Sequence, residues 1–168
     1  MKSGIKGWGL PRILLAASFA GYLLVLVYLM FVMHGRYWTD LTLWEYIRYN
    51  TNLVPFRTIG TYIRALSDNS MNMDTPVKNL LGNLLMFLPM GLYLPGFFKR
   101  LRTLGAFCIC MVALIFAVEA AELLLRRGSF DIDDFILNMT GALAGFTVFQ
   151  GIMKIRRRHA GAGSGNAE

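Results

Sequence analysis

The strongest constraint on the fold of this chain is an apolar segment near its start, residues 13–33, with 21 positions and no charged side chain. At about 1.5 Å per residue, a helix of that length is roughly 30 Å long, which matches the hydrocarbon core of a bilayer. A cleaved signal peptide is the alternative, but its apolar region normally covers only about 7–15 residues. Because the segment is longer than that and is followed by polar and aromatic residues, we predict a retained membrane-spanning helix.

Three further apolar segments follow, and each is long enough to cross a bilayer. Apolar residues make up 55% of the chain, against about 45–50% in soluble proteins. Pro89 and Pro95 fall inside the first of these three segments, where a proline removes a backbone hydrogen bond and can kink a helix. We predict an all-α integral membrane fold, with a bundle of four transmembrane helices in one domain, residues 1–153, and then a basic anchor and disordered tail, residues 154–168. The predicted spans are residues 13–33, 79–98, 104–125 and 135–153.

Basic residues indicate how the four segments are oriented. Ten lysines and arginines lie in short segments on the side of the N-terminus, and seven lie on the other side, spread over a longer length. Since Lys and Arg accumulate in cytoplasmic loops, we predict that both termini are cytoplasmic, in a bacterial plasma membrane. The chain has a net charge of +7, and its charged residues flank the apolar segments. This placement argues against a nucleic-acid partner and for contact with membrane lipids. The ten residues are Lys2, Lys6, Arg12, Lys99, Arg100, Arg102, Lys154, Arg156, Arg157 and Arg158.

A long polar and aromatic connection, residues 34–78, joins the first two predicted spans on the outer side in this topology. Four aromatic residues in its first part are typical of a membrane interface. Four apolar residues in its second part recur at the i, i+3, i+4, i+7 spacing of one helix face, so we predict interfacial helices in this extracellular loop. The aromatic residues are Trp38, Trp44, Tyr46 and Tyr49, and the apolar residues are Ile59, Tyr62, Ile63 and Leu66.

Polar residues gather at the outer ends of the last three predicted spans. The third span ends in two glutamates and two arginines, three aspartates follow in a short loop, and asparagines open the fourth and the second span. Carboxylates just inside a bilayer are costly, so they are usually paired and often functional. We predict an outward-facing polar pocket that binds a ligand and is lined by Asn79, Asn83, Glu119, Glu122, Arg126, Arg127, Asp131, Asp133, Asp134 and Asn138.

Each of these residue types also has a structural interpretation. Asparagines and Glu–Arg pairs can cross-link helices, and the three aspartates can cap the fourth helix and complement its dipole. The sequence Asp-Ile-Asp-Asp at residues 131–134 could hold Ca²⁺ or Mg²⁺, but it is too short and too common to be a metal motif, so we predict no metal and no cofactor. For Glu119 and Glu122 we favour a function, because burying two carboxylates is a poor way to stabilise a bundle.

The same region carries a family resemblance in three blocks. They are NLVPF at residues 52–56, NLLGNLLMFLPMG at residues 79–91, and residues 119–145, which contain RGSFDIDDFILN. With these blocks the chain resembles the VanZ-like membrane family, which is associated with resistance to teicoplanin-type glycopeptide antibiotics. That family usually has a glutamine at the position of Glu122, and its arginine falls at Arg127.

The two arginines therefore have different expected partners. Ideal helical geometry places Arg126 at i+4 from Glu122 and favours an ion pair between them. The resemblance instead points to Arg127. We hypothesise that the helix ends near Arg126, which frees Arg127 to fold back or to meet a ligand.

Three functions are compatible with these residues. The first is a protein that engages a lipid, a lipid-linked cell-wall precursor or a lipoglycopeptide in the outer pocket and so alters the access of glycopeptide antibiotics to the cell surface, as the resemblance implies. The second is an intramembrane enzyme that modifies a lipid headgroup or a lipid-linked precursor, with the neighbouring Glu119 and Glu122 as catalytic acid and base. The third is a transporter subunit, which is less supported because no internal repeat is visible.

Overall fold

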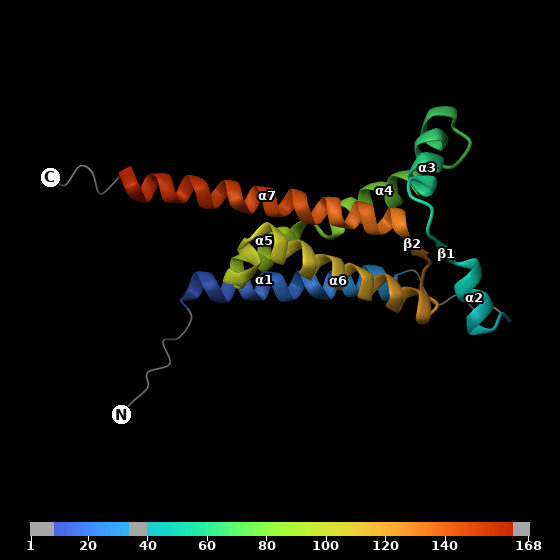
Figure 1. The fold of residues 1–168 in the computed structure, drawn as a ribbon, viewed down its shortest axis with the longest axis horizontal. Helices are drawn as coiled ribbons and strands as arrows, with labels where there is room; N and C mark the ends of the chain where they lie inside the picture. The colour runs from blue at the N-terminus through green and yellow to red at the C-terminus, as the bar shows by residue number, and fades with distance from the viewer. Residues whose placement is uncertain (1–8, 34–39, 163–168) are drawn as a thin grey trace, which may run out of the picture. The chain divides into compact units, whose positions relative to one another are not determined.

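The structure is a computed structural model that describes residues 9–33 and 40–162, with side chains as far as His159. The chain divides into two units, Met1–Gly35 and Arg36–Glu168, and each is described by itself (Figure 1). Some features expected from the sequence lie outside the described residues, namely Lys2, Lys6, Trp38 and the tail residues 163–168.

The first unit consists of one long helix. Helix α1 (Leu10–Val27) continues without a break into a π-helical segment, η1 (Tyr28–Val32). Together they form an apolar helix, Leu10–Val32, that is long enough to cross a membrane. A helix suited to the span predicted at residues 13–33 is therefore present, and it begins at Leu10.

The second unit holds three more helical segments that are long and apolar enough to cross a membrane, so four such segments occur in the described residues, as predicted. The third predicted span coincides with its helix, whereas the second and fourth begin earlier than expected. The last helix also continues to Ala162, so residues 154–162, expected as an anchor and tail, prolong it. Lys and Arg are good helix formers, and their long side chains can reach lipid headgroups from the helix. The elements are α2 (Leu43–Tyr49), β1 (Thr51–Asn52), α3 (Arg57–Asp68), α4 (Asp74–Met86), α5 (Leu88–Phe97), η2 (Lys99–Arg102), α6 (Leu104–Leu124), β2 (Phe130–Asp131) and α7 (Ile132–Ala162).

The second predicted span is two helices, α4 and α5, with a break at Phe87. Pro89 stands in the first turn of α5, where it lacks a backbone N–H and its ring crowds the carbonyl of Leu85. The chain responds with a tighter turn, in which the N–H of Met90 donates to the carbonyl of Phe87. Pro95, in contrast, lies inside α5 without ending it. The kink expected from the prolines is therefore present at the first of them.

Helix α7 packs against α4 and α5 through direct backbone contact. A Cβ atom on Gly141 would lie 1.9 Å from the carbonyl oxygen of Leu84, and one on Gly145 would lie 2.0 Å from that of Leu88. A Cβ on Gly91 of α5 would lie 2.2 Å from a carbonyl oxygen of α7. No side chain fits at these three positions, and the contact places α4 and α7 side by side in parallel, as small residues do in membrane bundles.

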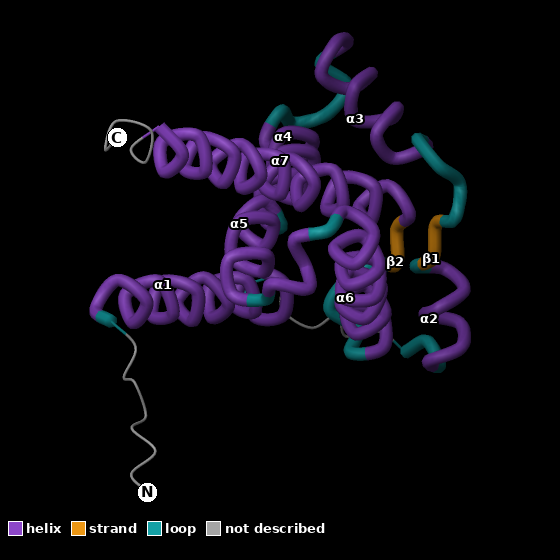
Figure 2. Tube along the Cα trace, turned by 60° about the vertical axis from the view of Figure 1, so that its left-hand side comes forward, coloured by secondary structure: helices purple, strands orange, loops and turns teal. Residues whose placement is uncertain are grey.

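A two-stranded parallel sheet, which the sequence did not indicate, joins two distant loops. Strand β1 pairs with β2, with Thr51 opposite Phe130 and Asn52 opposite Asp131. In Figure 2 the two strands lie side by side next to the start of α7. The pairing fastens the long connection between the first two spans to the loop between α6 and α7.

The two helices expected in that long connection are present. Helix α3 carries Ile59, Tyr62 and Leu66 half-buried, and it packs against α4 and α7, while Ile63 stays exposed. In α2, Trp44 and Tyr49 are exposed, which suits an interface. Helix α3 ends at Asp68 and α4 begins at Asp74, so a short loop joins them.

We predict that Gly141→Ala lowers the thermal stability of the protein, because the new methyl group must separate α7 from α4. Overpacking of this kind costs about 1–3 kcal/mol or more. Gly151→Ala is the matched control on the same helix, since no atom lies within 4 Å of a Cβ at that position. Alanine is the better helix former, so the control should be neutral or gain up to about 1 kcal/mol. Melting temperatures in detergent measure both, and equal values would contradict the contact.

Candidate ligand-binding site

The site begins where α6 ends, because the chain turns sharply there. Arg126 adopts a left-handed conformation with φ 55°. Its N–H donates to the carbonyl of Leu123, and the N–H of Arg127 donates to the carbonyl of Glu122. These two bonds form the Schellman motif, which usually has glycine at the left-handed position. The expected helix end near Arg126 is therefore confirmed.

Arg126 is held by α2 and does not pair with Glu122. Its guanidinium donates to the carbonyl of Leu41 at 3.0 Å and lies 5.7 Å from the centre of the Tyr46 ring. The pairing expected from ideal helical geometry is therefore wrong, because the helix stops before it can form. Tyr46, expected at the membrane interface, is buried instead, and its hydroxyl donates to the carbonyl of Gly128 at 2.9 Å.

Arg127 is half-buried, and its side chain makes no hydrogen bond or ion pair within residues 9–33 and 40–159. The ion pair found in that part of the chain joins Lys78 to Asp74, which lie one turn apart on the exposed start of α4. Among the residues that the structure describes, no cationic side chain therefore binds the glutamates of α6.

The three aspartates of the α6–α7 loop, which the sequence treated alike, make three different sets of contacts. Asp131 is the N-cap of α7, since its Oδ1 accepts the N–H of Asp133 at 2.9 Å. The same carboxylate accepts the hydroxyl of Thr58 at 2.6 Å and the amide of Asn52 at 3.1 Å. The capping interpretation is confirmed for this residue, and it also binds the 52–58 segment.

Asp133 caps a different helix from its own. Its carboxylate accepts the backbone N–H groups of Phe56 at 2.5 Å, Thr58 at 2.7 Å and Ile59 at 3.0 Å, which are the first amides of α3. Asp133 is fully buried, and Phe56 has φ 64° at the turn into α3. A carboxylate at a helix N-terminus also complements the helix dipole. The sequence block at residues 52–56 thus lies against the acidic loop.

Asp134 faces the transmembrane helices. It accepts a short hydrogen bond from the side-chain amide of Asn83 on α4. Tyr62 of α3 lies near it, and burial together with the charges of Asp134 and Asp131 raises the pKa of the Tyr62 phenol above its ordinary value. A tyrosine whose pKa is raised stays neutral at physiological pH, so it can donate a hydrogen bond there.

The deepest part of the cluster joins α6 to α7. The side-chain amide of Asn138 donates to Glu119 Oε1 at 3.3 Å, and the two residues are only 1% and 2% exposed. Three side-chain oxygen atoms among the expected residues are buried without a hydrogen-bond donor: Glu119 Oε2, Asn138 Oδ1 and, on α4, Oδ1 of Asn79. Buried acceptors without a partner are rare in native proteins and call for an explanation.

Glu122 lies one turn from Glu119, closer to the end of α6. It is half-buried, and a Cβ on Gly128 would lie 3.2 Å from its Oε2, so the loop passes close to the carboxylate. Glu119, Glu122 and Asp134 interact electrostatically with one another. We call these three residues the carboxylate cluster, and they share one end of the second unit with the aspartates that bind α3.

Hydrogen bonds and electrostatic interactions connect seven of the ten expected residues, namely Asn83, Glu119, Glu122, Asp131, Asp133, Asp134 and Asn138. Arg126 instead contacts Leu41 and Tyr46, and within the described residues no hydrogen bond or ion pair joins the side chain of Asn79 or Arg127 to the others. Four residues that hydrogen-bond around the site were not expected to do so: Asn52, Thr58, Tyr46 and Gly128. Asn52 and Gly128 nevertheless lie in blocks that carry the family resemblance. Whether the ten residues bind a ligand stays a prediction.

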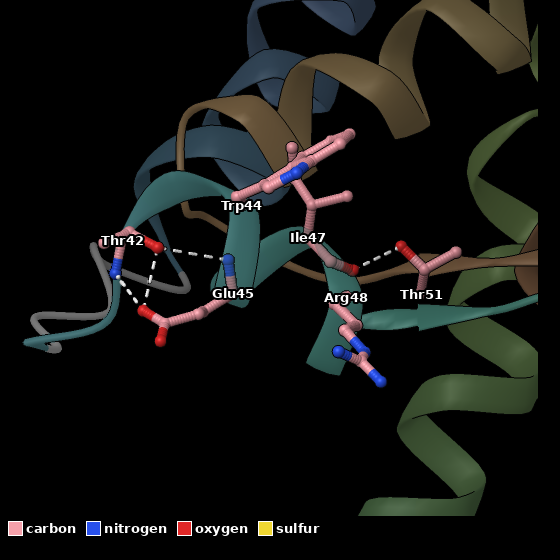
Figure 3. Close-up of a pocket in the computed structure, with 6 residues that line it drawn as sticks. All are labelled: Thr42, Trp44, Glu45, Ile47, Arg48 and Thr51. Atoms are coloured by element: carbon pink, nitrogen blue, oxygen red, sulfur yellow. Dashed lines mark hydrogen bonds between the residues drawn. The ribbon is translucent and has the colours of Figure 1, made fainter.

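A separate surface groove of about 570 Å³ runs along α2 (Figure 3). Trp44 and Ile47 point to one side of the helix, and Glu45 and Arg48 point to the other. Thr42 and Glu45 form a capping box, and the hydrogen bond from the Thr42 side chain lowers the pKa of Glu45. None of the residues that line this groove belongs to the carboxylate cluster.

Comparison of the sequence with known proteins assigns the chain to a family. The family model VanZ/LLP1 matches residues 19–154, which include every residue of the site. The chain belongs to the VanZ/LLP1 family. It is 26% identical over 138 residues to Protein VanZ of Enterococcus faecium, a match that covers 82% of this chain and 74% of that protein. No solved structure matches the chain. With four helices suited to span a bilayer, it is a multi-pass membrane protein of the VanZ/LLP1 family.

We predict that Asp133→Asn loosens the start of α3, because the amide offers one acceptor oxygen in place of two and carries no charge. Hydrogen bonds to charged groups contribute about 1.5–3 kcal/mol each. The variant should lower the melting temperature and speed hydrogen exchange at the amides of Phe56, Thr58 and Ile59. Asp74→Asn on the exposed start of α4 is the control. Unchanged exchange at the three amides would show that Asp133 does not hold α3.

Proposed function

We propose that this VanZ-family protein engages a lipid or a lipid-linked ligand at the carboxylate cluster and thereby lowers the susceptibility of the cell to teicoplanin-type glycopeptides. The observation that carries the proposal is the buried Glu119–Asn138 pair, whose remaining oxygen atoms have no donor within the described residues. A buried polar pair left half-satisfied is a poor stabilising device and a good binding device.

The cluster faces the outside of the cell in this proposal, and both termini are cytoplasmic. Lys99 and Arg100 follow α5 at the opposite end of the second unit from the cluster, and the basic residues 154–158 lie toward the far end of α7. Basic residues favour the cytoplasmic side, which supports an outward-facing cluster. From there a membrane-embedded site can reach molecules anchored in the outer leaflet.

The loops beside the cluster support a role in recognition. Asp131 and Asp133 hold the 52–59 segment in place, so the entry to the site is built from loops that are tied to α7. Half-buried Glu122 and Asp134 lie next to the buried Glu119, closer to the loops. A ligand that enters beside the loops would meet these two residues first.

An intramembrane enzyme is the second candidate. It is favoured by the electrostatic interaction between Glu119 and Glu122, because two neighbouring carboxylates tend to titrate apart and can then serve as acid and base. The substrate would be a lipid headgroup or a lipid-linked cell-wall precursor. The two candidates differ in whether both carboxylates are required.

We predict that Glu119→Gln abolishes resistance to teicoplanin while Glu122→Gln retains it, because related proteins usually carry glutamine at the second position. Susceptibility of cells that express each variant should be measured together with the melting temperature of the purified protein, with Asp74→Asn as the control for loss of one charge. Loss of resistance at an unchanged melting temperature assigns Glu119 to the site. A parallel fall in resistance and stability would make it structural, and greater damage from Glu122→Gln would favour the enzyme.

We predict that cysteine labelling in intact cells will place Asp68 outside the cell and Arg100 inside. In a chain with Cys108 and Cys110 replaced by alanine, Asp68→Cys should react with a membrane-impermeant thiol reagent and Arg100→Cys should not. Both positions are exposed, so accessibility of the side chain does not distinguish them. The reverse pattern would place the carboxylate cluster on the cytoplasmic side and refute the proposed function in this form.

A further inference from the structure

We propose that the buried end of the carboxylate cluster binds a protonated primary amine, carried by a lipid headgroup or by a small soluble molecule. The inference rests on the proposed function, in which the cluster engages a ligand, and it names the chemical group that is recognised. It is carried by three observations: the unsatisfied oxygen atoms, the missing counter-charge and the arrangement of the half-buried acids.

The buried side-chain atoms of the described residues that lack a hydrogen-bond partner are all acceptors. Glu119 Oε2, Asn138 Oδ1 and Asn79 Oδ1 are buried without a donor. The amide of Asn138 already donates to Glu119 Oε1, which fixes its oxygen as the free atom. Asn79 stands one turn before Asn83, on the face of α4 whose next turn binds Asp134. An occupant must therefore bring hydrogen-bond donors, and an ammonium group has three donors and no acceptor.

Within the described residues, no cationic side chain forms an ion pair with the carboxylates of the site. The charged groups that act on Glu119, Glu122 and Asp134 are other carboxylates of the same cluster and loop. Arg126 is turned toward Leu41 and Tyr46, and Arg127 makes no ion pair within the described residues. Carboxylates removed from water without a cation are strongly unfavourable, so a cationic ligand gains affinity and an anionic phosphate is repelled.

An ammonium group fits these acceptors better than a metal ion does. In residues 9–33 and 40–159 no three His, Cys, Asp or Glu side chains are arranged to hold a metal. Ca²⁺ takes about six to eight oxygen ligands and Mg²⁺ requires a near-ideal octahedron. Glu119 contributes one free oxygen, and the other free atoms are neutral amide oxygens on two other helices. Such a set suits a terminal –NH₃⁺ group, which needs few directed acceptors.

The neighbouring acids supply a path for a cation. Glu119 and Asn138 are buried, whereas Glu122 and Asp134 are half-buried and lie beside them. An ammonium that passes Glu122 and Asp134 keeps a negative partner as it leaves water. The lipid source and the soluble source share this chemistry, and the experiment below separates them.

The test uses the full-length protein in nanodiscs made of phosphatidylglycerol, with or without phosphatidylethanolamine or phosphatidylcholine. We expect phosphatidylethanolamine to raise the melting temperature and to stay bound in native mass spectrometry. Phosphatidylcholine should do neither, because its quaternary ammonium carries charge but has no N–H donor. Free ethanolamine is added to the phosphatidylglycerol discs in a separate arm. A response there identifies a soluble amine as a sufficient ligand, and a response to the lipid alone identifies a headgroup.

Two variants locate the binding. Glu119→Gln should weaken binding of the amine roughly ten- to a hundredfold, as expected for loss of a hydrogen bond to a charged group. Asn79→Ala removes an unsatisfied acceptor and no charge, so it should fold at least as well as the wild type while still weakening the amine. It keeps the test valid if Glu119→Gln does not fold. Asp74→Asn, outside the site, should bind the amine as the wild type does.

Three results would overturn the inference: an equal response to phosphatidylcholine, a response to Ca²⁺, Mg²⁺ or Na⁺ alone, and no response to either amine. If neither amine binds, protons rather than amines neutralise the carboxylates of the cluster. Failure here is distinguishable from failure of the proposed function. If cells that express the protein resist teicoplanin and no amine binds, only the inference fails. If amines bind and expression leaves teicoplanin susceptibility unchanged, the proposed function fails.

Discussion

One buried carboxylate, that of Asp133, connects the parts of the second unit on which the site depends. It belongs to the first turn of α7, yet it accepts the amides of Phe56, Thr58 and Ile59 that begin α3. Those amides have no partner within their own helix, and leaving them unsatisfied beside the membrane would be costly. A link across more than seventy residues therefore fixes where the long connection ends and the transmembrane helices begin.

Close packing of glycines sets the position of α4 relative to α7 beside the site. Gly141 and Gly145 bring the backbone of α7 onto the carbonyls of Leu84 and Leu88. The contact leaves no room for sliding, because any side chain at these positions would collide with main-chain atoms. The same approach holds α4 beside the start of α7, where Asn83 reaches Asp134. Close backbone packing at glycines thus determines which polar groups meet.

The carboxylate cluster is an exception to the otherwise satisfied polar network around it. Asp131 and Asp133 have several donors each, and Tyr46 and Arg126 hold α2 against the turn after α6. Glu119 accepts the side-chain amide of Asn138 and interacts with the backbone N–H of Asp131, and its Oε2 is buried without a hydrogen-bond partner. The polar network thus satisfies Asp131 and Asp133 fully, whereas Glu119 keeps one buried oxygen without a donor.

Length and hydropathy were enough to locate the four spans, because the thickness of a bilayer sets how long an apolar helix must be. The same local reasoning found the break at the Pro89 turn and the boundary at which the acids gather, whereas the end of α6 near Arg126 was indicated with the help of the family resemblance. Local reasoning failed wherever the partner is distant in the chain. Spacing along one helix paired Arg126 with Glu122, whereas the helix stops and α2 supplies the partners instead.

The roles of the aspartates were decided by tertiary structure alone. In the sequence, Asp131, Asp133 and Asp134 are three similar acids before a helix, and all three are equally suited to cap it. Only Asp131 does so, while Asp133 caps α3 and Asp134 binds α4. A sequence determines which side chains share a face of one helix, because 3.6 residues per turn is a local rule. It does not state what lies across from that face, since this depends on how close the glycines let the helices come.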